Sequence, residues 1–186
     1  MLRVSNVSAT RSGKLLFEGI SFDLAKGEVL QIKGPNGSGK SSLAAIISGD
    51  FQQNSGMVEC NFRIGVLLQN IEIDFPITVA EFVALGDKKG DVAGALVKLR
   101  ISELSEKLVT ELSVGQLQRV ELAQLLLQNP ELYILDEPFS AQDSENITYL
   151  IGLLKELKSS GKSIILINHI ELDLIGLVDQ TLQLQN

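Results

Sequence analysis

Short apolar runs alternate with longer segments of helical periodicity along this 186-residue chain. Segments of three to five residues that are rich in apolar side chains predict β-strands. The predicted strands are Leu2–Val4, Ile20–Leu24, Val29–Lys33, Ile64–Leu68, Leu132–Leu135, Ser163–Ile167 and Thr181–Leu184. Helices are predicted between several of them, and this alternation indicates an α/β fold.

Three predicted helices end at residues that commonly terminate helices. One follows Lys40 and stops at Gly49, and another covers about Gln116 to Gln128, before Pro130. A third covers about 144–159 and stops at Gly161. These are ordinary helix boundaries for an α/β core.

Between Asn70 and Glu111 the pattern becomes mostly helical. Helices are predicted at Val79–Leu85 and Val92–Arg100, with Gly86–Gly90 as the break. Repeats, low-complexity tracts and flexible linkers are absent from the sequence. We therefore expect residues 1–186 to form one domain, in which about 70–111 is an inserted helical subdomain packed on the core.

The composition limits the class of protein. The chain is 45% hydrophobic and 21% charged, which suits one well-buried core. With 16 basic and 23 acidic residues its net charge is −7, the wrong sign for gathering nucleic acid, so no nucleic-acid partner is expected. Cys60 is the only cysteine, which excludes an internal disulfide and favours a reducing compartment. The sequence shows neither a signal-peptide pattern nor an apolar run of roughly 18 residues, so no direct membrane insertion is expected.

A glycine-rich loop stands between the predicted strand Val29–Lys33 and the helix that follows it. The loop reads Gly34, Pro35, Asn36, Gly37, Ser38, Gly39, Lys40, Ser41 and Ser42. Its glycines let backbone N–H groups face one concavity, and the helix N-terminus adds positive potential. Lys40 supplies a charge for the β- and γ-phosphates, and the Ser41 hydroxyl is a ligand for Mg²⁺. This is a Walker A loop that predicts ATP or GTP binding, although such a turn also joins strands to helices without binding phosphate.

Two carboxylates follow a strongly apolar strand, in the run Leu132–Pro138. Parallel strands present ligands at their carboxyl ends. Asp136 is the candidate Walker B aspartate that holds Mg²⁺, since a hard cation prefers oxygen ligands. Glu137 is the candidate general base for the attacking water. Alternatively, Asp136 and Glu137 form an acidic turn at the end of the strand, without a role in binding or catalysis.

The run Leu112–Arg119 resembles the Leu-Ser-Gly-Gly-Gln signature of the ABC ATPase family. By that resemblance Ser113, Val114, Gly115 and Gln116 face the nucleotide bound by a second chain. Val114 stands where the family has glycine, and we expect weaker or slower closure from it. Ser113 and Gln116 also form a possible capping box, which is compatible with the first interpretation.

Three further residues match the family in the same order along the chain. Gln69 matches the Q-loop glutamine, which the family uses near magnesium and the attacking water; otherwise it is a polar strand end. Asp143, in Ser140–Asp143, matches the D-loop, or is simply the N-cap of the next helix. His169, the only histidine, matches the switch histidine that donates to the γ-phosphate, or is an unremarkable strand-end residue.

The family usually stacks an aromatic side chain on adenine ahead of the Walker A loop. The matching region is Ala9–Lys14, where Arg11 is the candidate. A guanidinium plane stacks on a purine, although Arg11 also fits a solvated surface residue. The preference for ATP over GTP is thus implied by the resemblance only.

The resemblance extends over nearly the whole chain and implies the fold, the mechanism and the cofactors, ATP and Mg²⁺. The implied fold is a P-loop NTPase core of the ABC type with a small antiparallel β arm and an inserted helical subdomain. The family dimerises head to tail, so catalytic Lys40, Gln69, Glu137 and His169 would act on ATP covered by the partner's signature loop. Ser41, Gln69 and Asp136 are the implied Mg²⁺ ligands. The active form would be a homodimer or a pair with another ABC subunit.

The resemblance also implies an integral membrane permease subunit as partner. The chain would then be a cytoplasmic ATPase, peripheral on the inner face of the cell membrane. The segment Phe75–Gly86 resembles metal-ion importers over a short stretch. A soluble ABC ATPase and a nucleotide-gated binding module with little hydrolysis are the alternatives.

Overall fold

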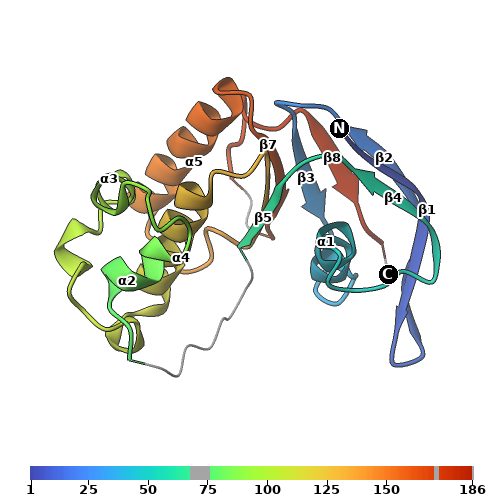
Figure 1. Ribbon diagram of the computed structural model, residues 1–186. Helices are drawn as coiled ribbons and strands as arrows, with labels where there is room; N and C mark the ends of the chain where they lie inside the picture. Colours follow the sequence, from blue (N-terminus) through green and yellow to red (C-terminus); the bar gives the residue numbers. More distant parts are fainter. Residues whose placement is uncertain (68–75, 170–171, 186) are drawn as a thin grey trace.

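A five-stranded parallel sheet crosses the centre of the protein. The computed structural model describes residues 1–67, 76–169 and 172–185 (Figure 1). The sheet consists of β3 (Val29–Lys33), β5 (Ile64–Leu67), β6 (Leu132–Asp136), β7 (Ser163–Ile167) and β8 (Gln180–Gln183). Its strand order is β5-β6-β7-β3-β8. The neighbours β6, β7 and β3 therefore end side by side, although they are far apart in sequence.

Every residue of the central strands β6 and β7 is buried, because both faces of the sheet are covered there, and this explains why these two strands are almost entirely apolar. In β6, Leu132 and Ile134 pack with helix α1 (Lys40–Ser48) and the antiparallel sheet. Tyr133 and Leu135, which alternate with them along the strand, pack with helices α4 (Val114–Gln128) and α5 (Ser144–Ser159) on the other face. Figure 1 shows α1 on one side of the sheet and α4 and α5 on the other.

A second, antiparallel sheet lies beyond α1. It contains β1 (Leu2–Arg11), β2 (Lys14–Leu24) and β4 (Ser55–Cys60), in the order β2-β1-β4. The predicted strands 2–4 and 20–24 were too short, because the pairing of β1 with β2 shifts register after Val4 and then continues. β4 was not predicted, since none of its side chains is fully buried and it shows no apolar run.

The main helices begin and end close to the predicted boundaries. Helix α1 (Lys40–Ser48) ends at Gly49, whose positive φ lets its N–H reach back to the last turn. Helix α4 (Val114–Gln128) starts two residues earlier than expected, because its N-cap is Ser113. Helix α5 (Ser144–Ser159) has the predicted length.

Residues 76–111 form short helices on the outer face of α4. They are α2 (Val79–Ala84), α3 (Val92–Lys98) and two 3-10 turns, η1 (Ser102–Leu104) and η2 (Val109–Glu111). α2 and α3 end one and two residues before the predicted boundaries. The Arg100 guanidinium lies 4.0 Å from the centre of the Tyr149 ring, and this contact holds the segment against α5.

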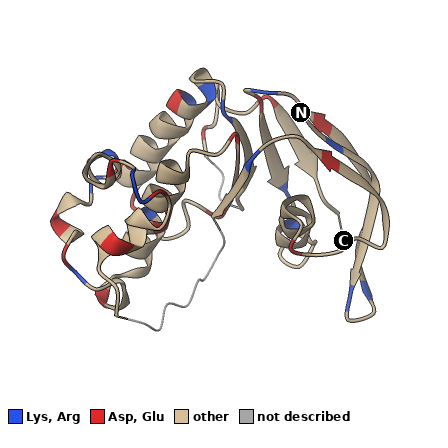
Figure 2. Ribbon diagram, viewed as in Figure 1, with Lys and Arg blue, Asp and Glu red and all other residues tan. Residues whose placement is uncertain are grey.

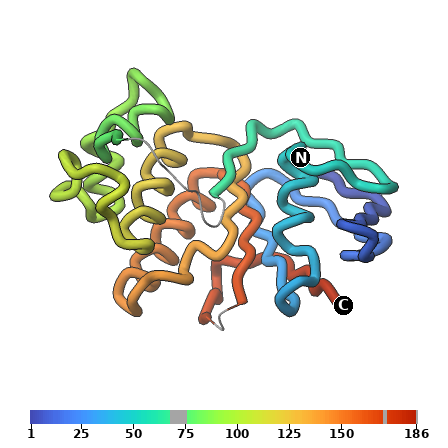
Figure 3. Tube along the Cα trace, turned by 90° about the horizontal axis from the view of Figure 1, so that it is seen from below, coloured from blue at the N-terminus to red at the C-terminus, as the bar shows by residue number. Residues whose placement is uncertain are grey.

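The two ends of the molecule differ in structure. Figure 3 shows residues 76–111 at one end and the β1–β2 hairpin at the other, with the parallel sheet between them. Figure 2 shows Lys and Arg mixed with Asp and Glu over both parts. Several of these charges are paired, as in Arg3 with Asp23 at 3.0 Å.

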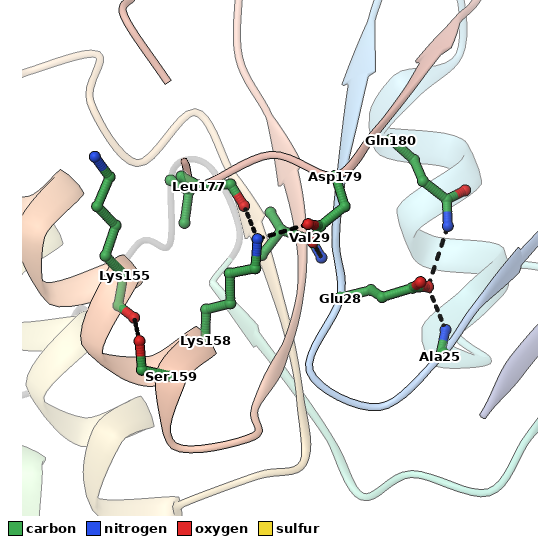
Figure 4. A network of polar contacts seen from close by, with 9 residues as sticks. All are labelled: Ala25, Glu28, Val29, Lys155, Lys158, Ser159, Leu177, Asp179 and Gln180. Carbon is green, nitrogen blue, oxygen red and sulfur yellow. Dashed lines mark hydrogen bonds and ion pairs between the residues drawn. The ribbon is translucent and has the colours of Figure 1, made fainter. Parts of the chain in front are cut away.

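A polar network fastens α5 to the amino-terminal edge of the sheet (Figure 4). Lys158 Nζ donates to the Leu177 carbonyl at 2.9 Å and to Asp179 Oδ1 at 2.6 Å. Asp179 Oδ2 accepts the Val29 N–H at 2.8 Å. Burial would raise the pKa of Asp179, but Lys158 and the Val29 N–H outweigh it and hold this pKa below its ordinary value. The network anchors β3 and β8 at the edge of the sheet opposite to the carboxyl ends of its strands.

Candidate active site

A cleft of about 440 Å³ lies at the carboxyl ends of β3, β6 and β7, beside the β1–β2 hairpin. It collects residues from five separate parts of the sequence. They are Arg11, Leu16, Asn36, Gly37, Gly39, Lys40, Ser41, Ser42, Asp136, Glu137 and His169. Part of the Walker A loop, Arg11, Asp136, Glu137 and His169, which were predicted from separate motifs, therefore line one cavity.

The glycine-rich loop between β3 and α1 forms the floor of the cleft. Gly39 has φ +91°, and a Cβ there would lie 2.7 Å from the Phe17 ring, so no other residue fits without rearrangement. Lys40 is 8% exposed, and its Nζ donates to the carbonyls of Gly34 at 2.9 Å and Pro35 at 3.0 Å. The ammonium is thereby held over the loop.

Asp136 ends β6 and is 3% exposed. Burial raises its pKa, and the neighbouring charge of Glu137 adds to this, although a hydrogen bond from the Ser41 hydroxyl and the charge of Lys40 act in the opposite direction. A buried carboxylate that is costly to ionise is a place where a cation binds favourably.

Glu137 and His169 meet across the ends of β6 and β7. His169 Nδ1 lies 2.7 Å from Glu137 Oε2, and the imidazole is half exposed whereas the carboxylate is buried. Glu137 has a left-handed backbone, with φ +54°, unusual for a residue other than glycine. Its N–H donates to the Ile167 carbonyl at 2.8 Å. The carboxylate is thus held between two neighbouring strands.

Helix α4 starts at the predicted signature loop. Ser113 and Gln116 form the capping box, with the Gln116 N–H donating to Ser113 Oγ at 3.3 Å and the Ser113 N–H to Gln116 Oε1 at 3.0 Å. Val114 is 70% exposed. A Cβ on Gly115 would clash with the Ala141 carbonyl, so the backbone needs glycine here. These residues are not among those that line the cleft within the described chain.

The remaining predicted residues have different positions. Gln69 lies outside the described residues, as does Leu68 at the end of the predicted strand. Asp143 is the N-cap of α5, accepting the Asn146 N–H at 2.8 Å, and does not line the cleft. Ser38 is buried within the loop beneath the cleft, and its Oγ has no hydrogen-bond partner among the described residues.

Residues 17–140 match the family model described as ABC transporter. The chain belongs to the ABC transporter family. It is 37% identical to a zinc import ATP-binding protein of Alcanivorax borkumensis over 179 residues, covering 91% of this chain and 69% of the relative. The manganese transport system ATP-binding protein of Bacillus subtilis is 32% identical over 191 residues, covering 90% and 76%.

Solved ABC structures have the same fold. An inward-facing putative metal-chelate type ABC transporter aligns with a TM-score of 0.86 and 28% identity, over 98% of this chain and 79% of that one. The ATP-binding cassette MJ1267 aligns with a TM-score of 0.85 and 25% identity, over 100% and 88%. The predicted ABC-type α/β fold is confirmed.

Membership of this family also confirms the predicted activity. The protein is an ATP-binding and ATP-hydrolysing subunit of an ABC transporter. Each helix within residues 1–67, 76–169 and 172–185 is too short or too polar to cross a bilayer.

Three residues around the ABC site were missed by the sequence analysis. Leu16 lines the cleft from β2, and no local signal marks it. Gln118 donates through Nε2 to the Glu137 carbonyl at 2.8 Å. Gln142 donates through Nε2 to the Gly115 carbonyl at 3.0 Å. Gln142 lies within Ser140–Asp143, next to the Asp143 that was singled out there, and no local signal in the sequence marks its contact with Gly115.

Proposed function

We propose that two copies of this ABC ATPase assemble head to tail and hydrolyse ATP in two composite sites. One observation carries the proposal: Lys40, Glu137 and His169 share a cleft that, among the described residues, the capped start of α4 does not line. A helix N-terminus favours a phosphate, and Ser113 and Gly115 lie at the N-terminus of α4, outside this cleft. A second copy brings the two halves together.

The cleft suits Mg²⁺ as well as ATP. The Ser41 hydroxyl and the Asp136 carboxylate are adjacent oxygen ligands, and burial of Asp136 favours a neighbouring cation. These two residues would hold the ion, with Gln69 as the third predicted ligand. Bound magnesium would neutralise charge on the phosphates.

Hydrolysis then uses groups already placed around the cleft. Glu137 accepts the proton of the attacking water, and His169, through Nδ1, orients the carboxylate. With Nδ1–H donating to Glu137, a second hydrogen bond from Nε2–H to the γ-phosphate would use the imidazolium form, in which both ring nitrogens are donors. Lys40 stabilises charge on the transferred phosphoryl group. Arg11 and Leu16 line the cleft on the hairpin side and would contact the base.

Mixing two inactive variants tests the composite site. Lys40→Ala breaks the Walker A half, and Ser113→Arg breaks the signature half. We expect each variant alone to lack turnover and the mixture to recover about a quarter of the parental rate, because about half of randomly paired dimers are mixed and each holds one intact site. An inactive mixture whose chains are shown to pair would contradict the head-to-tail arrangement.

We further propose that the ATPase lies on the inner face of the cell membrane, bound to a permease that imports a divalent transition-metal ion. The support is the naming of relatives as zinc import and manganese transport proteins. In proteoliposomes holding the permease and this chain, ATP should drive uptake of Zn²⁺ or Mn²⁺, and Lys40→Ala should abolish it. Uptake of a different solute class, with both metals excluded, would overturn the metal assignment.

A further inference from the structure

Two glutamines connect the signature loop with the catalytic glutamate of the same chain. We call Gln118, on α4, and Gln142, in the loop before α5, the glutamine pair. Gln142 Nε2 donates to the Gly115 carbonyl and to Gln118 Oε1, both at 3.0 Å. Gln118 Nε2 donates to the Glu137 carbonyl at 2.8 Å. Three consecutive hydrogen bonds therefore join Gly115 to Glu137.

The carbonyls at the two ends of this chain of hydrogen bonds determine how the side-chain amides of Gln142 and Gln118 are oriented. The carbonyls of Gly115 and Glu137 only accept, so each glutamine must turn its NH₂ group toward its own carbonyl. The Gln118 oxygen is then left facing the second N–H of Gln142. Turning either amide over would place two acceptors or two donors against each other, and at least one bond would be lost. The pair has a single consistent arrangement.

The end of this chain of bonds is the strained residue of the site. Glu137 has φ +54°, a left-handed conformation that is unfavourable for a residue with a side chain. Its backbone is held by the N–H bond to Ile167 and by the Gln118 amide on its carbonyl. Without the Gln118 bond, the peptide after Glu137 is freer to rotate. The direction of the carboxylate toward His169 depends on this backbone conformation.

Close packing supports the other end. The Ala141 carbonyl lies so close to Gly115 that a Cβ there would clash with it, so residues 140–143 and the first turn of α4 are in direct backbone contact. Gln142 follows Ala141 and bonds to Gly115 itself. A displacement of the first turn of α4 therefore also displaces the Gln142 side chain, whose Nε2 donates to Gln118 Oε1.

We propose that Gln142 is a positioning residue for hydrolysis: through Gln118 it holds the Glu137 backbone and links that geometry to the signature loop. In the proposed head-to-tail dimer the signature loop covers the partner's ATP, while Glu137 acts on the ATP of its own chain. The glutamine pair then couples the two sites. This last step rests on the proposed dimer, whereas the positioning of Glu137 does not.

The test compares Gln142→Leu and Gln118→Leu with a matched control, Gln124→Leu. Gln124 is also on α4 and also donates to a backbone carbonyl, that of Phe82 at 3.2 Å, away from the cleft. We expect kcat for ATP to fall about five- to tenfold in both pair variants, with KM changed less than about twofold. The double variant should lose no more than Gln118→Leu alone, because both act through one bond to Glu137. Where the parental rate rises cooperatively with ATP concentration because two ATP sites act together, that cooperativity should be weaker in Gln142→Leu and Gln118→Leu.

Backbone hydrogen exchange gives a readout that does not need turnover. The amides of residues 136–142 should exchange about tenfold faster in both pair variants, without a matching change in Gln124→Leu. Unchanged kcat in Gln142→Leu with an active parent would overturn the proposal. An equal fall of kcat in Gln124→Leu would also overturn the proposal, because the effect would then be a general destabilisation of α4. Parental turnover in Glu137→Gln would instead refute the proposed catalytic role of Glu137. The exchange experiment would still decide whether the glutamine pair holds the Glu137 backbone.

Discussion

Replacing Glu137 by glutamine is expected to lower kcat for ATP at least about 100-fold while ATP still binds. The amide keeps the size of the carboxylate and still accepts a hydrogen bond from His169 Nδ1, but it takes no proton from water. Because closure of the dimer does not need that proton transfer, the variant should accumulate as an ATP-bound dimer. Turnover measured by phosphate release and mass measured by size-exclusion chromatography with ATP and Mg²⁺ check both parts.

Glu131→Gln is the matched control for this substitution. Glu131 directly precedes β6, the strand that Glu137 follows, but at the opposite edge of the sheet, where its carboxylate accepts the Arg63 N–H at 3.0 Å. Its replacement should leave kcat near the parental value. Parental turnover in Glu137→Gln would remove this residue from the role of general base, and an equal loss in both variants would point to damage of β6 rather than of the chemistry.

Glu121 is expected to make the protein less stable as the pH rises. This residue lies on α4, is 7% exposed, and its Oε1 has no hydrogen-bond partner among the described residues. Burial raises the pKa of Glu121 to about 7, from 4.5 for the unfolded side chain. The folded protein therefore binds the proton more tightly than the unfolded chain, and stability is lost between these two pKa values as the pH increases.

Glu121→Met should remove that loss, because methionine fills a similar volume without a charge. At pH 8 we expect the free energy of unfolding to increase by about 1–3 kcal/mol, and at pH 5 to change much less. Urea denaturation at the two pH values measures the difference. Glu156→Met, at a position on α5 whose side chain is 71% exposed, is the control and should show no comparable pH dependence. A loss of stability in Glu121→Met at pH 8 would show that the carboxylate is stabilising.

The elements predicted well are those with local signals. Gly49 ends α1 and Ser113 caps α4, because a left-handed residue and a capping side chain act on backbone groups a few residues away. The apolar runs of β6 and β7 were readable because both faces of a parallel sheet are buried. The antiparallel sheet was predicted less well, since the alternation in β1 is interrupted where Asn6 adopts φ +51°. β4 is mostly exposed and depends on its partner strand for its conformation.

The family was readable from the sequence, because its motifs consist of contiguous residues whose spacing the chemistry requires, and so were the glycine-rich loop and the two carboxylates after β6 as candidate site residues. Which of these groups lie together depends on the fold. Strand order brings Glu137 beside His169, and packing of residues 140–143 on α4 brings Gln142 within reach of Gly115 and Gln118. Such contacts join residues distant in sequence, and burial and strand pairing, which no local pattern encodes, bring them together.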